Sequence, residues 1–288
     1  MSRLIVNADD FGLTPGVNRA IIELHRAGVL TSTTLMAKAA ATDEAISLAL
    51  GNPTLGVGCH IVLVDGEPVL PPRQVPSLID KSTGRLYQSL VQFLQRLFTG
   101  RIRTAEIEAE AGAQIALLQR RGLQLTHVDT HKHTHMFPSV LRPVLRAARS
   151  CGIRCVRNPF EPEWAVRATP RASFIRSAEV FALRRFGPYF RRLIATEGFK
   201  TTDGTIAIAG TGVVNSDTVR SLLRQLPSGT WELVTHPGYN DADLDKVRTR
   251  LRESRNIERA ALRAIKEFPA IELTSFAALP TTTGHAII

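Results

Sequence analysis

Apolar, β-rich runs alternate with stretches of helical periodicity along most of this 288-residue chain. Nearly every expected strand is followed by an expected helix, and strands joined by crossover helices form a parallel sheet. The expected strands are residues 4–8, 32–36, 55–62, 125–129, 153–157, 231–235 and 271–276. The expected helices are residues 16–27, 42–50, 86–98, 104–121, 139–150, 216–225 and 244–267. The pattern predicts an α/β fold built on a parallel barrel or a barrel-like sheet.

The chain is expected to form a single domain over residues 1–288, because no Pro/Gly/Ser-rich linker and no internal repeat interrupts it. No apolar run is long enough to span a membrane, and the N-terminus turns acidic at Asp9 before a signal-peptide core forms. The three cysteines lack the spacing of a disulfide framework or a zinc site. These features favour a cytoplasmic protein.

The net charge of +10 is the unusual bulk property, and it favours an anionic surface as a partner. We expect no nucleic-acid partner, because no helix-turn-helix, zinc finger or RNP motif is present and only 3 Tyr and 2 Trp are available for base stacking. The positive charge is concentrated in residues 164–194, which we interpret as a basic amphipathic insertion. This segment holds seven arginines and the single acid Glu179: Arg167, Arg171, Arg176, Arg184, Arg185, Arg191 and Arg192.

Polar residues with catalytic potential gather where the expected strands end, which is where α/β barrels carry their active sites. Asn7, Asp9 and Asp10 follow the first strand, and His60 follows the third. Six of the eight histidines occupy such positions, all except His25 and His285. The six are His60, His127, His131, His133, His135 and His236.

Residues 127–135 place titratable side chains at every second position: His127, Asp129, His131, His133 and His135. If this stretch is extended, the five side chains share one face. Imidazole and carboxylate ligands with an open position for water are typical of a catalytic metal site. The alternative is a histidine-rich loop that binds metal only adventitiously. For Asp9 and Asp10, the alternative is a pair of helix-capping residues.

Several motifs resemble those of the YdjC-like carbohydrate deacetylases, a family related to chitooligosaccharide deacetylases. They are NADDFG at 7–12, TSTT at 31–34, GCH at 58–60, THVDTHKHTHMFP at 126–138 and HPG at 236–238. The resemblance spans roughly residues 3–276. The stretch TEGFKTT at 196–202 and the Arg-rich segment most resemble the branch associated with hopanoid biosynthesis.

The resemblance implies an irregular, TIM-barrel-like (βα) barrel that holds one divalent metal ion. Asp10, His60 and His131 would be the metal ligands, Asp9 the catalytic base and His236 the catalytic acid. The remaining residues of the set would contact these groups or the substrate: Asn7, His127, Asp129, His133 and His135. Two nitrogens and one oxygen suit Zn²⁺, whereas the resemblance also permits Mg²⁺, so the ion stays open between the two.

The basic segment further suggests a lipid-linked substrate. Aromatic and aliphatic residues interleave with its arginines, as in helices that lie at a membrane surface. The side chains expected to face the membrane are Arg184, Arg185, Phe186, Phe190 and Arg191, and the protein would then be peripheral at the inner face of the membrane. The alternative is that the apolar face of the segment covers the barrel or a partner in a homodimer.

The leading hypothesis is therefore a metal-dependent hydrolase that removes the N-acetyl group from an N-acetylglucosamine unit, in particular one linked to a hopanoid lipid. The enzymatic alternative is a soluble chitooligosaccharide or diacetylchitobiose deacetylase with the same catalytic groups. The alternative of another class is a basic membrane- or nucleic-acid-binding module with a structural metal. Removing a structural metal unfolds a protein, whereas removing a catalytic metal leaves it folded and inactive.

Overall fold

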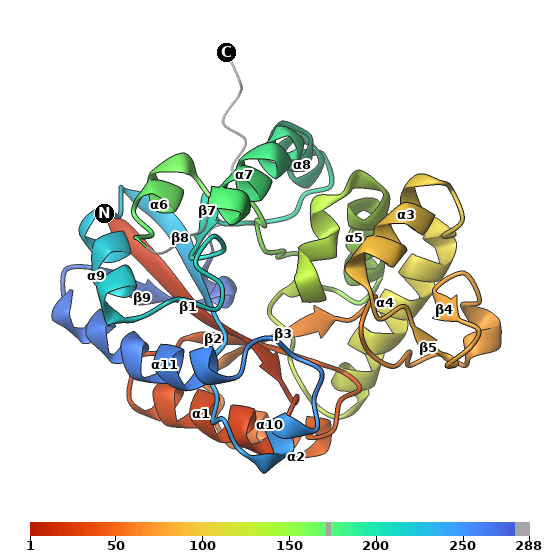
Figure 1. Ribbon diagram of the computed structural model, residues 1–288, viewed down its shortest axis with the longest axis horizontal. Helices are drawn as coiled ribbons and strands as arrows, with labels where there is room; N and C mark the ends of the chain where they lie inside the picture. The colour runs from red at the N-terminus through yellow and green to blue at the C-terminus, as the bar shows by residue number, and fades with distance from the viewer. Residues whose placement is uncertain (171–173, 280–288) are drawn as a thin grey trace.

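The computed structural model describes the backbone of residues 1–170 and 174–279, and it describes no side chain between 171 and 177. Arg171, the side chain of Arg176 and His285 therefore lie outside the described residues. The central feature is a curled parallel sheet with the strand order β6-β3-β2-β1-β8-β7, in which β9 also pairs with β1 (Figure 1). The strands are β1 (Ser2–Phe11), β2 (Ser32–Leu35), β3 (Gly56–Ile61), β6 (Val128–Thr130), β7 (Gly204–Ile206), β8 (Gly229–Thr235) and β9 (Glu272–Thr274).

The two edges of this sheet approach each other through short bridges. Val128 of β6 pairs with Val156, and Cys155 pairs with Lys200, which leads into β7. The expected strand at 153–157 therefore contributes only isolated bridges. The resulting fold is of the irregular TIM-barrel type, as the resemblance implied.

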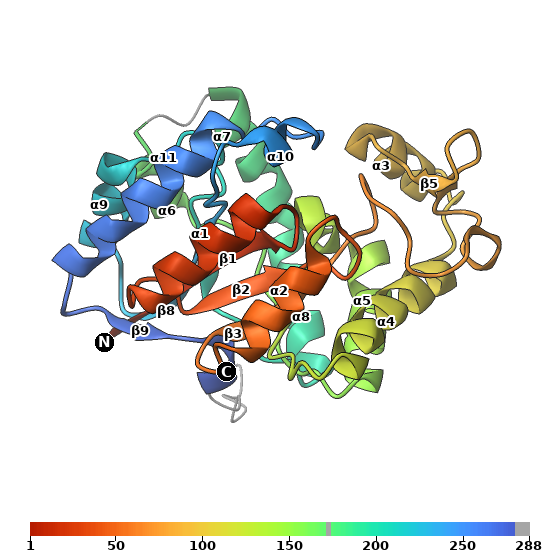
Figure 2. The ribbon, with the colours of Figure 1, turned by 90° about the horizontal axis from the view of Figure 1, so that it is seen from below.

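Helices cover the outside of the sheet in the expected alternation. They include α1 (Pro15–Arg26), α2 (Thr42–Leu50), α4 (Thr104–Arg120), α5 (Pro138–Ser150), α9 (Ser216–Arg224) and α11 (Glu253–Ala261). Helix α1 begins where Thr14 accepts a hydrogen bond from the backbone N–H of Val17 and Pro15 occupies the first turn. Every residue from Leu4 to Phe11 of β1 is buried, as is typical of a central parallel strand covered on both faces. Helix α11 runs beside α1 (Figures 1 and 2).

Three more expected elements differ from the structure. Strand β6 begins at Val128 and continues to Thr130, so the expected strand at 125–129 is placed too early. The expected helix at 86–98 is shortened to α3 (Leu90–Phe98), because Arg85–Leu86 forms β5 and pairs with β4 (Ile79–Asp80). The expected helix at 244–267 is divided into α10 (Ala242–Asp245), α11 and η4 (Leu262–Glu267), with a non-helical Arg252 before α11.

The long connection from β3 to α3, residues 62–89, is held by one face of α4. Glu110 accepts hydrogen bonds from the backbone N–H groups of Val69 and Leu70, at 2.7 and 3.0 Å. Gln114 bonds the backbone N–H and C=O of Val62. These contacts explain why α4 buries polar side chains. The connection also includes the turn η1 (Pro72–Gln74).

The Arg-rich segment forms the crossover between the bridge at 155–156 and β7. It consists of α6 (Glu163–Arg167), α7 (Phe174–Leu183), η3 (Arg184–Phe186) and α8 (Gly187–Thr196). Phe190 is fully buried, with its ring centroid 5.6 Å from that of Phe160. The expectation that Phe190 faces a membrane is therefore wrong, because this side chain packs into the core. Among the described residues, no helix has the length and apolar character needed to cross a membrane.

Candidate active site

The strand-end residues singled out by the sequence converge at one end of the barrel. Asp9 and Asp10 lie in β1, His60 lies in β3, and His236 directly follows β8. His131 begins η2 (His131–Met136), directly after β6. Because β1, β3 and β8 run parallel within one sheet, their carboxyl ends meet, as predicted.

Asp10, His60 and His131 present three ligand atoms to one another. The Asp10 Oδ1 atom is 3.5 Å from His60 Nε2 and 3.5 Å from His131 Nδ1, and the two ring nitrogens are 3.2 Å apart. Asp10 reaches this position through a left-handed backbone, with φ of 65°. The three residues form a candidate metal site.

This triangle fits a divalent ion. Ligands of a tetrahedral zinc ion at about 2.0–2.2 Å would lie about 3.3–3.6 Å apart. Adjacent ligands of an octahedral magnesium ion at about 2.0–2.1 Å would lie about 2.8–3.0 Å apart. The observed spacing of 3.2–3.5 Å and the donor set of one carboxylate and two imidazoles fit a divalent ion.

The candidate ligands are oriented by neighbouring charges. Asp129 Oδ1 lies 2.8 Å from His60 Nδ1 and directs the other ring nitrogen towards Asp10. Burial lowers the pKa of His60, but the carboxylates of Asp129, Asp9 and Asp10 outweigh it and raise this pKa to about 9. Burial raises the pKa of Asp10, yet Arg255 and His131 hold it well below its usual range. Arg255 Nη2 donates to Asp10 Oδ2 at 2.5 Å.

Asp9 is held by Arg157, a residue that the sequence analysis missed. Arg157 donates to both oxygens of Asp9, at 2.6 and 2.8 Å, and also to Asp129 and Glu232. Burial alone raises the pKa of Asp9, but Arg157 outweighs this effect and keeps the pKa far below its usual range. Burial raises the pKa of Glu232 to about 7 despite the same arginine. Asp9 is therefore ionised and fixed in orientation.

His236 stands beside Asp9 at the mouth of the barrel. Its Nε2 atom is 3.9 Å from Asp9 Oδ2, and its Nδ1 atom is 3.9 Å from Glu258 Oε2. Burial lowers the pKa of His236 to about 4, although Asp9 and Asp10 act in the opposite direction. The neutral imidazole is thus placed to exchange a proton with groups near Asp9.

A family model described as YdjC-like protein matches residues 3–268 of the chain. The chain belongs to the YdjC-like family. A carbohydrate deacetylase of Thermoanaerobacter pseudethanolicus is 29% identical over 262 residues, which cover 91% of each chain. A human carbohydrate deacetylase is 30% identical over 82% of this chain and 75% of its own length. One from Brevibacillus brevis is 43% identical, and this match spans 55% of the chain and 60% of that relative.

Solved structures support the same fold. A proposed cellobiose-phosphate cleavage protein from Enterococcus faecalis superposes with a TM-score of 0.73 at 27% identity, covering 96% of this chain and 97% of its own. A lactam utilization protein from Thermus thermophilus shares only the fold, with a TM-score of 0.53 at 15% identity, covering 95% of this chain and 99% of its own.

The histidine series of this YdjC-like chain, residues 127–135, is not extended beyond β6, so the expectation that its side chains share one face is wrong. After β6, residues 131–136 form the short turn η2, in which Lys132 and His133 have positive φ. His135 turns back to Thr130, with 2.7 Å between Nδ1 and the hydroxyl oxygen. The buried Nδ1 atom of His133 has no hydrogen-bond partner among the described residues. Only His131 of the series joins the candidate metal site.

The remaining predicted residues divide between the site and the core. Asn7 Nδ2 donates to Asp9 Oδ1 at 2.9 Å, and Asp129 contacts His60 and Arg157. His127 instead stacks on Phe276, with ring centroids 3.8 Å apart, and its Nδ1 atom lies 2.9 Å from the Thr126 hydroxyl oxygen. The ring is thus packed in the core.

The packing of His127 leads to a prediction at Gly58. A Cβ atom added at Gly58 would lie 2.5–2.7 Å from three atoms of the buried His127 ring. We expect Gly58→Ala to destabilise the protein by about 1–3 kcal/mol through overpacking, measured by urea unfolding. Gly112→Ala is the matched control, because its added Cβ would meet only Ala147 Cβ at 3.9 Å. Equal midpoints for both variants would contradict the prediction.

Sequence reasoning missed further residues of the site: Thr34, Arg157, Glu232, Arg255 and Glu258. Thr34 belongs to the TSTT motif, and its hydroxyl lies within 3.2–3.4 Å of His60, Asp9 and Asp129. Arg157 is the last residue of the expected strand 153–157, and site residues were sought where expected strands end. This strand-end rule therefore covers Arg157, but the many arginines of the chain made this one inconspicuous.

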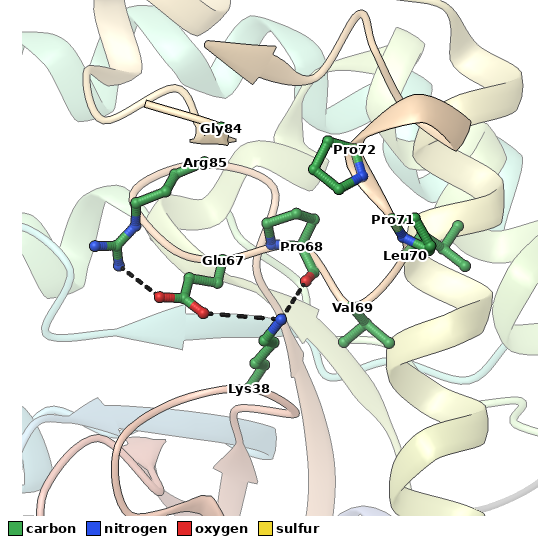
Figure 3. A pocket seen from close by; sticks show the side chains of 9 residues that line it. All are labelled: Lys38, Glu67, Pro68, Val69, Leu70, Pro71, Pro72, Gly84 and Arg85. Atoms are coloured by element: carbon green, nitrogen blue, oxygen red, sulfur yellow. Dashed lines mark hydrogen bonds and ion pairs between the residues drawn. The ribbon is translucent and has the colours of Figure 1, made fainter. Parts of the chain in front are cut away.

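A cavity of about 250 Å³ is lined by a different set of residues (Figure 3). It is lined by residues of the connection 62–89 and by Lys38, and none of the predicted site residues is among its lining. Its charged side chains pair with one another, because Glu67 lies 3.8 Å from Lys38 Nζ and 3.4 Å from Arg85 Nη2. This cavity is not the candidate active site.

Proposed function

We propose that this protein is a metal-dependent hydrolase that removes the N-acetyl group from an N-acetylglucosamine unit. The observation that carries the proposal is the convergence of the Asp10, His60 and His131 triangle with Asp9 and His236. Its named relatives are carbohydrate deacetylases, which supports the same reaction.

A divalent ion held by Asp10, His60 and His131 would polarise the acetyl carbonyl and make water a stronger nucleophile at neutral pH. The chain's own residues move the protons. Asp9, fixed by Arg157, accepts a proton from the attacking water as the new C–O bond forms. His236 Nε2 lies 3.9 Å from Asp9 Oδ2, a span that one water bridges, so this proton passes through a water to His236, which delivers it to the sugar nitrogen as the C–N bond breaks. Acetate and a free amine are the products.

Metal removal separates this function from a binding module with a structural metal. We expect the chelated protein to lose acetate release and to keep its far-UV circular dichroism, since Arg255 and Asp129 still hold Asp10 and His60. Added Zn²⁺ should restore activity. Unfolding on chelation would instead indicate a structural metal.

For the substrate, we propose a lipid-linked, specifically hopanoid-linked, N-acetylglucosamine. Val180 of α7 packs against Ile208 and Ala209, which follow β7 at the active end of the barrel. The adjacent Phe181 is 68% exposed, and Arg185 and Arg191 are exposed. This surface would rest on anionic lipid near the site. Arg184 lies 3.7 Å from Glu163, and Phe186 packs against Phe137, so these two contribute less.

Vesicle binding tests the membrane contact. We expect the wild-type protein to co-sediment with anionic vesicles at low salt, and the Arg185→Glu/Arg191→Glu variant to lose most of this binding. The control, Arg73→Glu/Arg101→Glu, makes the same charge change at exposed positions elsewhere and should still bind. A wild-type protein that stays in the supernatant would exclude the membrane contact.

The second candidate is a soluble deacetylase of chitooligosaccharides or diacetylchitobiose. It is favoured by the inward packing of Phe190 and Phe186, which leaves Phe181 as the exposed aromatic of the described part of the segment. A second copy of the chain could also cover Phe181 in a homodimer.

Acetate release distinguishes these substrates. The assay compares an N-acetylglucosaminyl hopanoid with diacetylchitobiose, using wild-type protein, a chelated sample and Asp10→Ala. Preference for the lipid, lost in both controls, would support the full proposal. Preference for the soluble sugar would support the deacetylase reaction and contradict the proposed lipid-linked substrate. No acetate release from either substrate would count against the deacetylase function.

A further inference from the structure

The first turns of α11 touch two separate parts of the candidate active site. Arg255 donates from Nη2 to the candidate ligand Asp10, and its backbone oxygen accepts from the N–H of Gly238 at 3.2 Å. Glu258, three residues later, reaches His236. A Cβ atom added at Gly238 would lie 3.1 Å from Val17 Cγ2 and 3.3 Å from Arg255 Cβ, so the turn after His236 is packed tightly between α1 and α11.

The Glu258 carboxyl group is fully buried beside His236. Its Oε2 atom accepts the backbone N–H of His236 at 2.7 Å and lies 3.9 Å from the ring Nδ1. Its Oε1 atom has no hydrogen-bond partner among the described residues. A buried carboxyl group is retained at a cost in desolvation unless it satisfies neighbouring donors. The groups that lower its pKa are the backbone N–H groups of His236 and Gly212 and the positive charge of Arg255.

We propose that Glu258 is a positioning residue that holds His236 in the Nδ1–H tautomer, with Nε2 directed at Asp9 and the scissile amide. The inference rests on the proposed function, since it assigns His236 the proton transfer. At 3.9 Å the carboxylate of Glu258 attracts a proton on Nδ1 electrostatically, so the lone pair stays on Nε2, where the proton from Asp9 has to arrive. The opposite tautomer would place the lone pair of Nδ1 against the carboxylate. Its Nε2 atom would already carry a hydrogen and could not accept the proton that comes from Asp9.

Burial raises the pKa of Glu258 to about 7, against the lowering effects of the His236 N–H, Arg255 and Gly212, while Asp9 acts in the same direction as burial. His236 is also faced by Asp9 and Asp10 from β1, and by Arg255 and Arg157. Glu258 carries its charge above its pKa, so its hold on the tautomer strengthens as the pH rises through about 7.

The test compares Glu258→Gln with Glu253→Gln. The glutamine at 258 can still accept the backbone N–H of His236, but it has lost the charge. Glu253 begins the same helix, is exposed and bonds Asn240, so it is the matched control. The ring nitrogens of His236 are observed by ¹⁵N NMR at pH 8, with His236→Gln used to assign the signals. kcat and KM for acetate release are measured between pH 5.5 and 8.5.

We expect the wild type and Glu253→Gln to show the Nδ1–H tautomer, and Glu258→Gln to show a mixture or the Nε2–H form. We also expect Glu258→Gln to lower kcat by at least tenfold with little change in KM, and to lose the rise in kcat near pH 7. An unchanged tautomer and pH profile in a folded Glu258→Gln protein would overturn the inference. If the wild type shows the Nδ1–H tautomer but releases no acetate, the proposed function fails and the positioning of His236 by Glu258 stands.

Discussion

Replacing Asp9 with asparagine is expected to lower kcat for acetate release by about 10²–10⁴, the usual contribution of a general base. The amide has nearly the shape of the carboxylate, but it cannot accept the proton of the attacking water. In the wild type, Arg157 donates to both oxygens of Asp9. The amide oxygen of the variant can still accept one of these hydrogen bonds. The measurement is kcat at matched metal content, determined by elemental analysis of each preparation.

The control for this prediction is Asp217→Asn, the same substitution at an exposed aspartate in the first turn of α9. It should leave kcat unchanged. If Asp9→Asn binds metal as the wild type does and retains activity within about tenfold, Asp9 is not the base. Loss of metal from Asp9→Asn would instead assign it a role in holding the neighbouring ligand Asp10.

The strand-end rule found the residues whose position depends only on the order of strands. Asp9, Asp10, His60 and His236 all follow or end buried strands, and parallel strands deliver such residues to one edge. The family resemblance, rather than the spacing, selected His131 from the histidine series. Spacing alone suggested an extended chain there, whereas the positive φ values at Lys132 and His133 turn the backbone directly after His131.

The residues that hold the site together could not be found from local patterns. Arg255 and Glu258 lie in a helix whose sequence is as polar as that of an ordinary exposed helix, yet both are buried. Their burial depends on the packing of α11 against the site, where Arg255 bonds Asp10 and Glu258 bonds the backbone N–H of His236. Strand β7 was missed because Gly204–Ile206 is too short to show alternation, and it pairs only because β8 presents an open edge. Such features depend on tertiary contacts.

The charged core beneath the site carries the largest predicted effect on stability. Arg157 is the shared partner of Asp9, Asp129 and Glu232, and all four side chains are buried. Arg157→Met keeps much of the side-chain volume and removes the cation that contacts all three acids. We expect it to lower the free energy of unfolding by about 3–5 kcal/mol, as is usual when one partner of a buried ion pair is removed. Urea unfolding at pH 7 measures this loss.

The pH dependence of the stability of Arg157→Met provides a second check. Without Arg157, three carboxyl groups remain buried close together, and protonating one of them relieves both repulsion and desolvation. The wild type also gains stability as the pH falls from 8 to 6, because the raised pKa values of Glu232 and Glu258 lie near 7. Arg157→Met should gain more over the same range, because Arg157 no longer keeps the pKa of Asp9 and Asp129 below the usual range. Adding Glu232→Met to Arg157→Met should also recover stability, because one uncompensated buried acid is then removed.

Arg220→Met, which breaks an exposed pair with Glu267, is the control and should change stability little. If Arg157→Met lost no more free energy of unfolding than Arg220→Met, the three acids would have other partners in the variant or would be protonated at pH 7, and the prediction would be wrong.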